Sequence, residues 1–281
     1  MNAEATLSTT PLTARSPYEL RVNLSKNVPE NYVKHALETG ETGFLHSFTT
    51  GSTVDGPGVR LVGWTSGCQF KCLYCHNPDT WKMMNGLPVS LERAAEELSK
   101  YQHGLRIMRG GLTLSGGEPL MQDRFAVRLF ATAQKMRIHT ALDTNGSLGA
   151  RLSDAELEKI DLVMLCIKSL DPVQHRALTG KDLAPTLEFA QRLSERKRPM
   201  WLRFVLVPGL TDSEQQVDEM AKFAAGLGVC EHVDILPFHQ MGQYKWEKLG
   251  LQYPLANVEP PPGETIKRVC EQFHAEGLTA Y

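Results

Sequence analysis

The feature that most restricts the fold of this chain is a regular alternation, from Val59 onward, between short apolar runs and longer amphipathic stretches. Short apolar runs bounded by turn residues are typical of buried strands, and longer amphipathic stretches are typical of helices. Six strand-then-helix units in succession, joined by right-handed crossovers, predict a parallel sheet covered by helices. The expected strands are Val59–Thr65, Leu112–Leu114, Ile138–Leu142, Leu162–Ile167, Trp201–Val207 and Val233–Leu236, and the expected helices are Ser90–Gln102, Arg124–Met136, Asp154–Ile160, a pattern ending near Glu195, Ser213–Gly226 and Glu264–Glu276.

Periodicity alone does not separate a doubly wound sheet from a partial barrel, but the placement of polar residues does help. Functional side chains gathered at the carboxyl ends of successive strands are typical of a (β/α) barrel. The sequence shows no repeat at a fixed period and no internal linker, so we predict one α/β domain over residues 43–281. The polar residues just past the expected strands are Glu118, Asp143, Lys168 and His239, and Arg203 lies within one of these strands.

Size and charge exclude several classes of protein. The chain has 281 residues and a formal net charge of −2 at pH 7, which gives no basis for a nucleic-acid surface. No apolar run approaches the roughly 18 residues of a membrane span, and Met1–Arg15 lacks the apolar core of a secretory signal. We therefore expect a cytoplasmic protein whose cysteines are ligands or buried thiols rather than disulfides, with isolated Cys230 and Cys270 as packing residues.

The first 42 residues have a different composition. Met1–Thr42 is polar, rich in Ser, Thr, Asn and Glu, and has no Trp, Phe or Cys. A segment of this kind buries little apolar surface, so we predict a disordered N-terminal extension with a short helix around Glu30–Leu37. An organelle transit peptide is the alternative, against which Glu4 and Glu19 argue.

The strongest chemical signal is Cys68-Gln-Phe-Lys-Cys72-Leu-Tyr-Cys75, with three thiols spaced three and then two residues apart. Three clustered cysteines with no fourth nearby suit a [4Fe–4S] cluster, because one iron then keeps an open position for a small molecule. A structural zinc site is the alternative, but zinc normally takes four ligands, and His76 is awkwardly placed to be the fourth. Chance is the third reading, and this spacing arises by chance roughly a few times in a thousand.

This Cys-x3-Cys-x2-Cys spacing resembles the signature of the radical S-adenosylmethionine (SAM) enzymes. The wider stretch, from His46-Ser-Phe through Thr53-Val-Asp-Gly-Pro-Gly-Val-Arg60 to the Asp-Thr-Trp81 that follows the cysteines, resembles the pyruvate formate-lyase-activating family of that superfamily. The likeness runs from about Phe44 to the C-terminus. It implies a partial (β/α)6 barrel of the radical SAM type, open on one side to a macromolecular substrate.

The likeness also assigns roles around a SAM site. The stretch Leu-Ser-Gly116-Gly117-Glu118-Pro is similar to the family's Gly-Gly-Glu element, which holds the amino group of SAM. Read alone, it is a glycine turn after a strand, where glycines allow close approach to a ligand and a carboxylate can accept from an ammonium. The residues expected at the adenine end of SAM, which would otherwise be simple loop packing, are Tyr74, His76 and Asn77.

A second strand end departs from the family pattern. Asp143-Thr144-Asn-Gly would be a solvated turn on its own, and the likeness makes Asp143 and Thr144 ligands of a monovalent cation beside the SAM carboxylate. The next strand ends in Asp-Leu-Lys in the family but in Cys166-Ile-Lys168 here. Lys168 can neutralise the SAM carboxylate, whereas a thiol is a poor ligand for a hard cation. We therefore expect Cys166 to lie at the SAM site and the cation site to be weakened or rebuilt.

Three further residues complete the expected site. Arg203 matches the family's equivalent strand, and a buried arginine needs a carboxylate partner, either that of SAM or a structural one. His239, in Leu-Pro-Phe-His-Gln-Met-Gly-Gln-Tyr-Lys-Trp246, is placed by the likeness at the SAM ribose. Asp55, in Asp-Gly-Pro-Gly, matches a position that contacts the incoming glycyl loop, with a capped turn as the equal alternative.

The likeness implies an oxidoreductase that cleaves SAM reductively and abstracts a glycine Cα hydrogen from pyruvate formate-lyase (formate C-acetyltransferase). The implied cofactors are one [4Fe–4S] cluster, SAM and a monovalent cation, and no side chain acts as a catalytic acid or base. The implied partners are the glycyl-radical enzyme and a flavodoxin or ferredoxin electron donor under anaerobic conditions. The chain itself is expected to be a monomer.

Other readings remain open. The stretch between Cys75 and Cys166 contains no cysteine, which disfavours the activases of other glycyl-radical enzymes, because many of those carry extra clusters there. A radical SAM enzyme acting on a small molecule is disfavoured by the histidine-bearing stretch before Trp246. A non-catalytic zinc or iron–sulfur module that binds a partner is the alternative from a different class.

Overall fold

The computed structural model describes residues 30–281, and these contain one eight-stranded sheet in the order β3-β1-β2-β4-β5-β6-β7-β8. Six of these strands, namely β2, β4, β5, β6, β7 and β8, run parallel to one another. Strand β1 is antiparallel to both β2 and β3. The strands are β1 (Thr42–Ser52), β2 (Arg60–Thr65), β3 (Leu87–Ser90), β4 (Gly111–Gly116), β5 (His139–Thr144), β6 (Leu162–Cys166), β7 (Met200–Leu206) and β8 (Cys230–Pro237).

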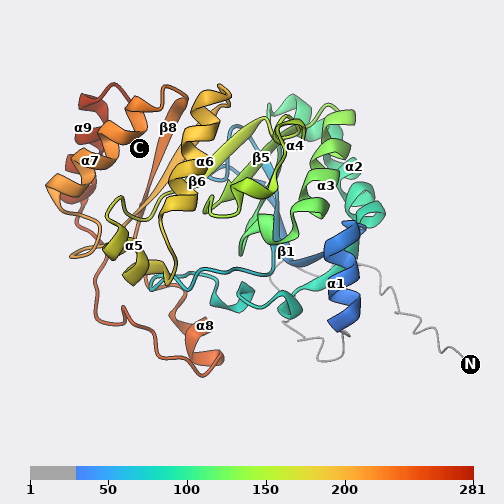
Figure 1. Ribbon diagram of the computed structural model, residues 1–281, viewed down its shortest axis with the longest axis horizontal. Coiled ribbons are helices and arrows are strands. Elements are labelled where there is room, and N and C mark those ends of the chain that lie inside the picture. The colour runs from blue at the N-terminus through green and yellow to red at the C-terminus, as the bar shows by residue number, and fades with distance from the viewer. Residues whose placement is uncertain (1–29) are drawn as a thin grey trace, which may run out of the picture.

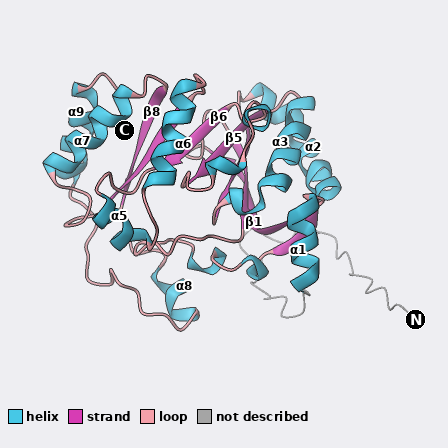
Figure 2. Cartoon of the chain, in the orientation of Figure 1, coloured by secondary structure: helices cyan, strands magenta, loops and turns pink. Residues whose placement is uncertain are grey.

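The larger helices flank the sheet, and α8 lies apart from them at the lower edge in Figure 1. Figure 2 shows the same arrangement, with strands inside and helices outside. None of the helices in residues 30–281 combines the length and the apolar character needed to cross a membrane. The helices are α1 (Glu30–Thr39), α2 (Leu91–Ile107), α3 (Asp123–Lys135), α4 (Asp154–Leu157), α5 (Pro172–Thr179), α6 (Ala184–Glu195), α7 (Glu214–Gly226), α8 (Gln243–Lys248) and α9 (Gly263–Ala275).

The parallel part of the sheet confirms the predicted partial (β/α)6 barrel, because β2, β4, β5, β6, β7 and β8 are the six expected strands with slightly shifted ends. The antiparallel strands β1 and β3 were not predicted. In β1 most side chains are half-buried or exposed, so the sequence contains no apolar run there. With four residues, β3 is too short for periodicity to reveal it.

Capping residues begin the helices where the sequence indicates. The Ser90 hydroxyl accepts a hydrogen bond from the Arg93 N–H at 3.1 Å, so Ser90, the first residue of the expected helix, is the N-cap of α2. The Ser213 hydroxyl does the same for the Gln216 N–H at the start of α7. Each bond satisfies one of the free backbone N–H groups that a helix start exposes.

The main apolar core lies between the sheet and the surrounding helices. Leu114 of β4, Leu142 of β5 and Phe130 of α3 are all fully buried in it. A smaller cluster of Leu162, Met164 and Trp201 with a buried alanine forms a second core on the sheet. A further apolar cluster, which includes Val207 just after β7 and Phe238 just after β8, packs against the cysteine loop at the carboxyl ends of the strands, where the functional side chains also gather.

The N-terminal helix expected around Glu30–Leu37 is present as α1. Its Ala36 is buried against Phe44 of β1, so residues 30–42 pack on the domain, and this part of the chain is not the disordered extension that the composition predicted. The remainder of the predicted extension, residues 1–29, lies outside the described residues. The physical reason for the packing is the apolar face that α1 presents to β1.

Candidate active site at the carboxyl ends of the parallel strands

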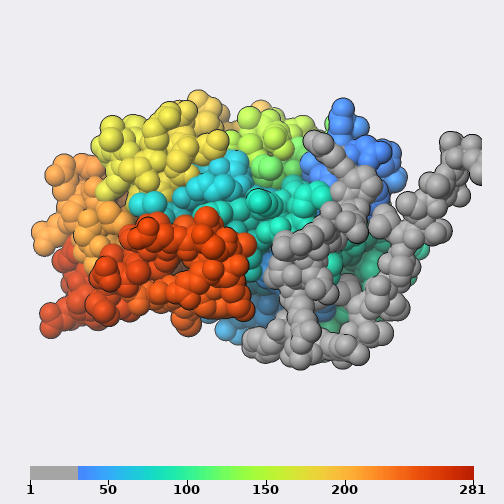
Figure 3. Space-filling model, turned by 90° about the horizontal axis from the view of Figure 1, so that it is seen from below, coloured from blue at the N-terminus to red at the C-terminus, as the bar shows by residue number. Residues whose placement is uncertain are grey.

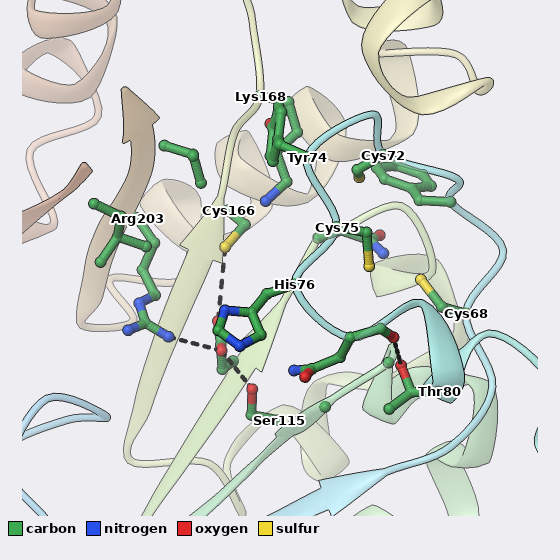
Figure 4. Close-up of a pocket in the computed structure, with 18 of the residues that line it drawn as sticks. Cys68, Cys72, Tyr74, Cys75, His76, Thr80, Ser115, Cys166, Lys168 and Arg203 are labelled. Atoms are coloured by element: carbon green, nitrogen blue, oxygen red, sulfur yellow. Dashed lines mark hydrogen bonds and ion pairs between the residues drawn. The ribbon is translucent and has the colours of Figure 1, made fainter. Parts of the chain in front are cut away.

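A cavity of about 500 Å³ opens at the carboxyl ends of the parallel strands. Parallel strands all end at the same edge of a sheet, so side chains from distant parts of the sequence meet there. Figure 4 shows the three cysteines on one side of this cavity and Arg203 and Cys166 on the other. The predicted residues that line it are Cys68, Cys72, Tyr74, Cys75, His76, Asn77, Gly116, Gly117, Asp143, Thr144, Cys166, Lys168, Arg203 and His239.

Backbone hydrogen bonds hold the cysteine loop in place after β2. The Cys68 N–H donates to the Trp81 carbonyl at 3.1 Å, which closes the loop on itself. On the other side, the Lys71 and Leu73 N–H groups donate to carbonyls at the end of α5, at 2.9 and 3.0 Å. The three thiols are therefore carried on a backbone that is fixed at both flanks.

The three thiols fit an iron–sulfur cluster by their chemistry. Burial raises the pKa of all three, that of Cys75 to about 12, so each thiol is protonated until a metal displaces its proton. The backbone N–H groups of Phe70 and Asn77 act in the opposite direction and lower the pKa of Cys68 and of Cys75, which favours the thiolate form that binds iron. Within residues 30–281, no three His, Cys, Asp or Glu side chains converge enough to hold a single metal ion.

The glycine pair after β4 is required by close packing. Gly116 has φ of +111°, and a Cβ there would lie 2.3 Å from the Thr65 backbone nitrogen. A Cβ on Gly117 would lie 2.3 Å from the Gly67 carbonyl oxygen. The turn therefore packs directly on the start of the cysteine loop, and both glycines present backbone to the cavity.

The Glu118 carboxylate does not line the cavity, in contrast to the expectation that it meets the SAM ammonium. It is fully buried and accepts hydrogen bonds from the Leu120 N–H (3.0 Å), the Thr144 hydroxyl (2.7 Å) and the Asn145 N–H (2.8 Å). Burial raises the pKa of Glu118 to about 7 in spite of these donors. The side chain thus ties the β4 turn to the β5 turn.

Arg203 on β7 lies among three carboxylates, of which that of Asp55 is buried and the other two are partly buried. Its guanidinium is 2.8 Å from the Asp143 carboxylate, 3.2 Å from that of Asp234 and 3.6 Å from that of Asp55. Burial alone would lower the pKa of Arg203, but the acidic neighbours, Asp143 first among them, raise it above its usual value. The sequence left either the SAM carboxylate or a structural carboxylate as the partner of Arg203, and in the structure Arg203 is paired with structural carboxylates.

Asp55 was expected to contact an incoming loop, but it is buried and absent from the cavity wall. Its carboxylate accepts from the Ser52 hydroxyl, and burial raises its pKa. Its neighbour Val54 instead lines the cavity with 70% of its surface exposed, and the Val54 carbonyl accepts from Arg203 at 3.0 Å. The capped-turn reading of Asp55 therefore fits its position.

Asp143 and Thr144, the expected cation ligands, both have protein partners. The Asp143 carboxylate accepts from the Ser115 hydroxyl at 2.6 Å and from Arg203, and the Cys166 sulfur lies 3.7 Å from its other oxygen. The Thr144 hydroxyl donates to Glu118. The negative charge of Asp143 is thus already balanced by a fixed guanidinium.

Lys168 is the cation that faces the cysteine side of the cavity, and Figure 4 shows its amine directed inward. Its amine lies 5.9 Å from the centre of the Tyr74 ring. Burial opposes the charge, but the acidic side chains around the amine, Asp143 among them, raise the pKa of Lys168. Burial raises the pKa of Cys166 to about 11, so its thiol is protonated. A charged amine is available there for an anionic group of a ligand.

The opposite wall comes from the stretch after β8. The ring of His239 lies 4.8 Å from that of His76 in an edge-on arrangement, so the two predicted residues are in contact with each other at the cavity wall. Burial, together with nearby positive charge, lowers the pKa of His76 to about 4, so this ring is neutral. The His76 ring therefore offers neutral polar and aromatic surface to a ligand, and the His239 ring packs edge-on against it.

The prediction from sequence missed several residues of the site. Ser115 holds Asp143 and lies near the carboxyl end of β4, so the strand-end rule used above is a signal that could have found it. Asp234 holds Arg203 from the middle of β8, where a carboxylate inside an apolar strand is the available signal. Lys245 and Trp246 contact the cysteine loop from α8. No local pattern identifies these two, because their partners are far away in the sequence.

A partial barrel with a three-cysteine loop at its carboxyl edge defines a radical SAM protein. Residues 62–224, more than half of the chain, match the family model of the radical SAM superfamily, and the chain belongs to that superfamily. It is 40% identical over 242 residues to the pyruvate formate-lyase-activating enzyme of Staphylococcus epidermidis, covering 84% of this chain and 96% of that protein. Within the superfamily, the chain is therefore a member of the pyruvate formate-lyase-activating enzyme family.

Solved structures support the fold. A radical SAM methyltransferase from Sphaerobacter thermophilus is similar over 94% of this chain and 84% of its own, with a TM-score of 0.56 and 18% identity. Streptococcus suis SuiB bound to its precursor peptide SuiA is similar over 91% of this chain and 54% of its own, with a TM-score of 0.60 and 15% identity. At these identities, the likeness concerns the fold alone.

Proposed function

We propose that this chain cleaves SAM reductively and generates a glycyl radical on pyruvate formate-lyase by abstracting a hydrogen from a glycine Cα. The observation that carries the proposal is the single cavity shared by the three thiols of the cysteine loop and the strand-end residues expected to bind SAM. The membership of the chain in the activating-enzyme family supports the same reaction.

In this proposal Cys68, Cys72 and Cys75 hold one [4Fe–4S] cluster. The cluster, when bound, supplies one electron to the SAM sulfonium, which yields methionine and a 5′-deoxyadenosyl radical that takes the glycine hydrogen. The chain contributes binding, orientation and the exclusion of water, and no side chain need act as an acid or base. The three thiols come from one fixed loop, which supports their assignment as a set of ligands.

The remaining wall residues are proposed to hold SAM. The backbone at Gly116 and Gly117 receives the amino group, since the Glu118 carboxylate is turned to other partners. Lys168, the charged amine of the wall, pairs with the methionine carboxylate, and its neighbour Cys166 contributes a neutral thiol to the same wall. The residues proposed at the ribose and adenine end are Tyr74, His76, Asn77 and His239.

The monovalent cation is proposed to be dispensable in this chain. Arg203 already neutralises Asp143, and Cys166 supplies a thiol where the family carries a carboxylate. Activity measured against potassium and sodium concentration tests this proposal. A cation dependence that Asp143→Ala abolishes would contradict it.

The partners follow from the proposed reaction. Because the cluster must be reduced, a flavodoxin or ferredoxin is the proposed electron donor, and the chain is proposed to act as a cytoplasmic monomer on its glycyl-radical partner. Asp55 is buried in the isolated chain, so a contact with the partner's loop is proposed only through its exposed neighbour Val54.

The decisive experiment mixes this protein anaerobically with SAM, a reductant and pyruvate formate-lyase, and follows electron paramagnetic resonance. A glycyl doublet and stoichiometric 5′-deoxyadenosine are expected, and Cys72→Ala should abolish both. A doublet only with a different glycyl-radical enzyme would identify the chain as that enzyme's activase. One zinc and no acid-labile sulfide, in place of about four irons after reconstitution, would instead identify a partner-binding module.

A further inference from the structure

Three segments that are distant in the sequence meet in a polar cluster just behind the cavity wall. The His46 ring nitrogen Nε2 on β1 lies 3.0 Å from the Asp79 carboxylate, after the third cysteine. The Lys245 ammonium on α8 donates to the Asn77 side-chain oxygen at 2.6 Å and lies 3.7 Å from the other oxygen of Asp79. The Lys245 side chain is only 14% exposed, so its charge is held largely out of water.

Helix α8 is seated on the cysteine loop at two further points. The Trp246 indole N–H donates to the Cys75 carbonyl at 2.9 Å, and its ring lies 5.0 Å from the Trp81 ring. A Cβ on Gly242 would lie 2.9 Å from the backbone of His76, so only glycine allows this approach. Figure 3 shows the orange-red segment that contains α8 lying against the cyan segment that contains the cysteine loop.

Among these contacts between α8 and the cysteine loop, the one made by Lys245 involves a charged side chain of α8. The Asp79 oxygen that faces it is buried and accepts no hydrogen bond among the described residues, so the ammonium is its counter-ion. A partly buried ion pair with a charge-assisted hydrogen bond constrains orientation more than an apolar contact does. Lys248, on the same helix, instead places its amine 5.0 Å over the exposed Tyr244 ring.

We propose that Lys245 is a positioning residue for SAM, acting through Asn77 and Asp79. By fixing the residues that follow Cys75, it sets the position of the His76 ring, and through the short connection from His239 to α8 it sets the facing ring as well. The two rings, which are in contact with each other, then present one fixed surface to the ribose and adenine end of SAM. This inference rests on the proposed function, because it concerns the same cavity.

The test compares Lys245→Met with Lys248→Met in anaerobically reconstituted enzyme. Loss of a charge-assisted hydrogen bond at a preorganised wall should raise KM for SAM roughly tenfold and lower kcat for SAM cleavage less than threefold. Lys248→Met should leave both parameters unchanged. Hydrogen exchange of the protein before reconstitution should rise in the stretch after Cys75 and in α8 with Lys245→Met only.

Lys245→Arg and a double-mutant cycle with Asp79→Asn complete the test. The arginine variant keeps the charge and should recover most of the SAM affinity. Asp79 does not line the cavity, so Asp79→Asn should add little to Lys245→Met because both remove the same ion pair. An unchanged KM, or effects of the two substitutions that simply add, would overturn the inference. A wild-type protein that produces no 5′-deoxyadenosine would overturn the proposed function instead, so the two failures are distinct.

Discussion

Replacing Arg203 with methionine should remove a large part of the stability of the protein. The guanidinium is the counter-charge of three carboxylates, at 2.8 Å from Asp143, 3.2 Å from Asp234 and 3.6 Å from Asp55. All four side chains are at most 13% exposed, so water cannot replace the arginine. Breaking a buried ion pair costs about 3 to 5 kcal/mol of unfolding free energy. The loss cannot grow beyond this range, because a carboxylate left without its counter-ion can take up a proton and become neutral.

Urea unfolding of the anaerobically reconstituted enzyme measures this loss as a shift of the midpoint at constant m-value. The loss should depend on pH with a definite sign. Without Arg203 the pKa of the orphaned carboxylates rises in the folded state, and that of Asp55 is raised by burial even with Arg203 in place. A carboxylate with a raised folded-state pKa contributes stability at low pH, and this contribution is lost as the pH rises. The gap between variant and wild type should therefore narrow from pH 7.5 to pH 5.

Arg196→Met is the matched control. Arg196 is 56% exposed and pairs with Asp154 at the surface, so its loss should leave the urea midpoint unchanged. A double variant, Arg203→Met with Asp143→Asn, should recover part of the loss, because one orphaned charge is removed with its partner. The reasoning is refuted if Arg203→Met matches Arg196→Met in midpoint at both pH values.

Three further substitutions test the site and the fold. Burial raises the pKa of Glu118 from 4.5 to about 7. The contribution of this carboxyl group to stability is therefore present below pH 4.5 and falls by up to about 3 kcal/mol as the pH rises through 7. Glu118→Gln should flatten this part of the stability–pH curve. Gly116→Ala puts a Cβ 2.3 Å from the Thr65 nitrogen at a positive φ, and should cost about 3 kcal/mol in urea unfolding and weaken SAM binding in equilibrium dialysis, with unchanged binding as the contradicting result. Ser90→Ala removes the N-cap of α2 and should lower the unfolding free energy by about 1 kcal/mol with SAM binding unaffected.

The parallel strands could be predicted because their signal is local. Each of β4, β5 and β6 is an apolar run between turn residues, and such a run in alternation with amphipathic helices specifies a parallel sheet wherever the chain folds. Strand β1 could not be predicted in the same way, because its side chains are mostly half-buried or exposed. Its pairing with β2 and β3 is decided by edges that exist only after the sheet has formed.

The positions of Glu118 and Asp55 show where reasoning from motifs ends. Glu118 was expected to face a ligand, and Asp55 either to contact an incoming loop or to cap a turn; both side chains are buried with protein partners. The partners of Glu118, at Thr144 and Asn145, belong to the next strand end, and Arg203 reaches Asp55 from β7. A motif identifies a carboxylate, but only the folded sheet determines which donor reaches it first.

The sequence by itself determined the thiol set, since the spacing of Cys68, Cys72 and Cys75 fixes how far apart three thiols on one short loop can lie. It also determined the order of strands and helices, through periodicities that extend over a few residues. Only the tertiary structure decided how charges are paired around the cavity and that Lys245 meets Asn77 across 168 residues of chain. The physical reason is that electrostatic pairing depends on distance in space, which the order of residues along the chain does not specify.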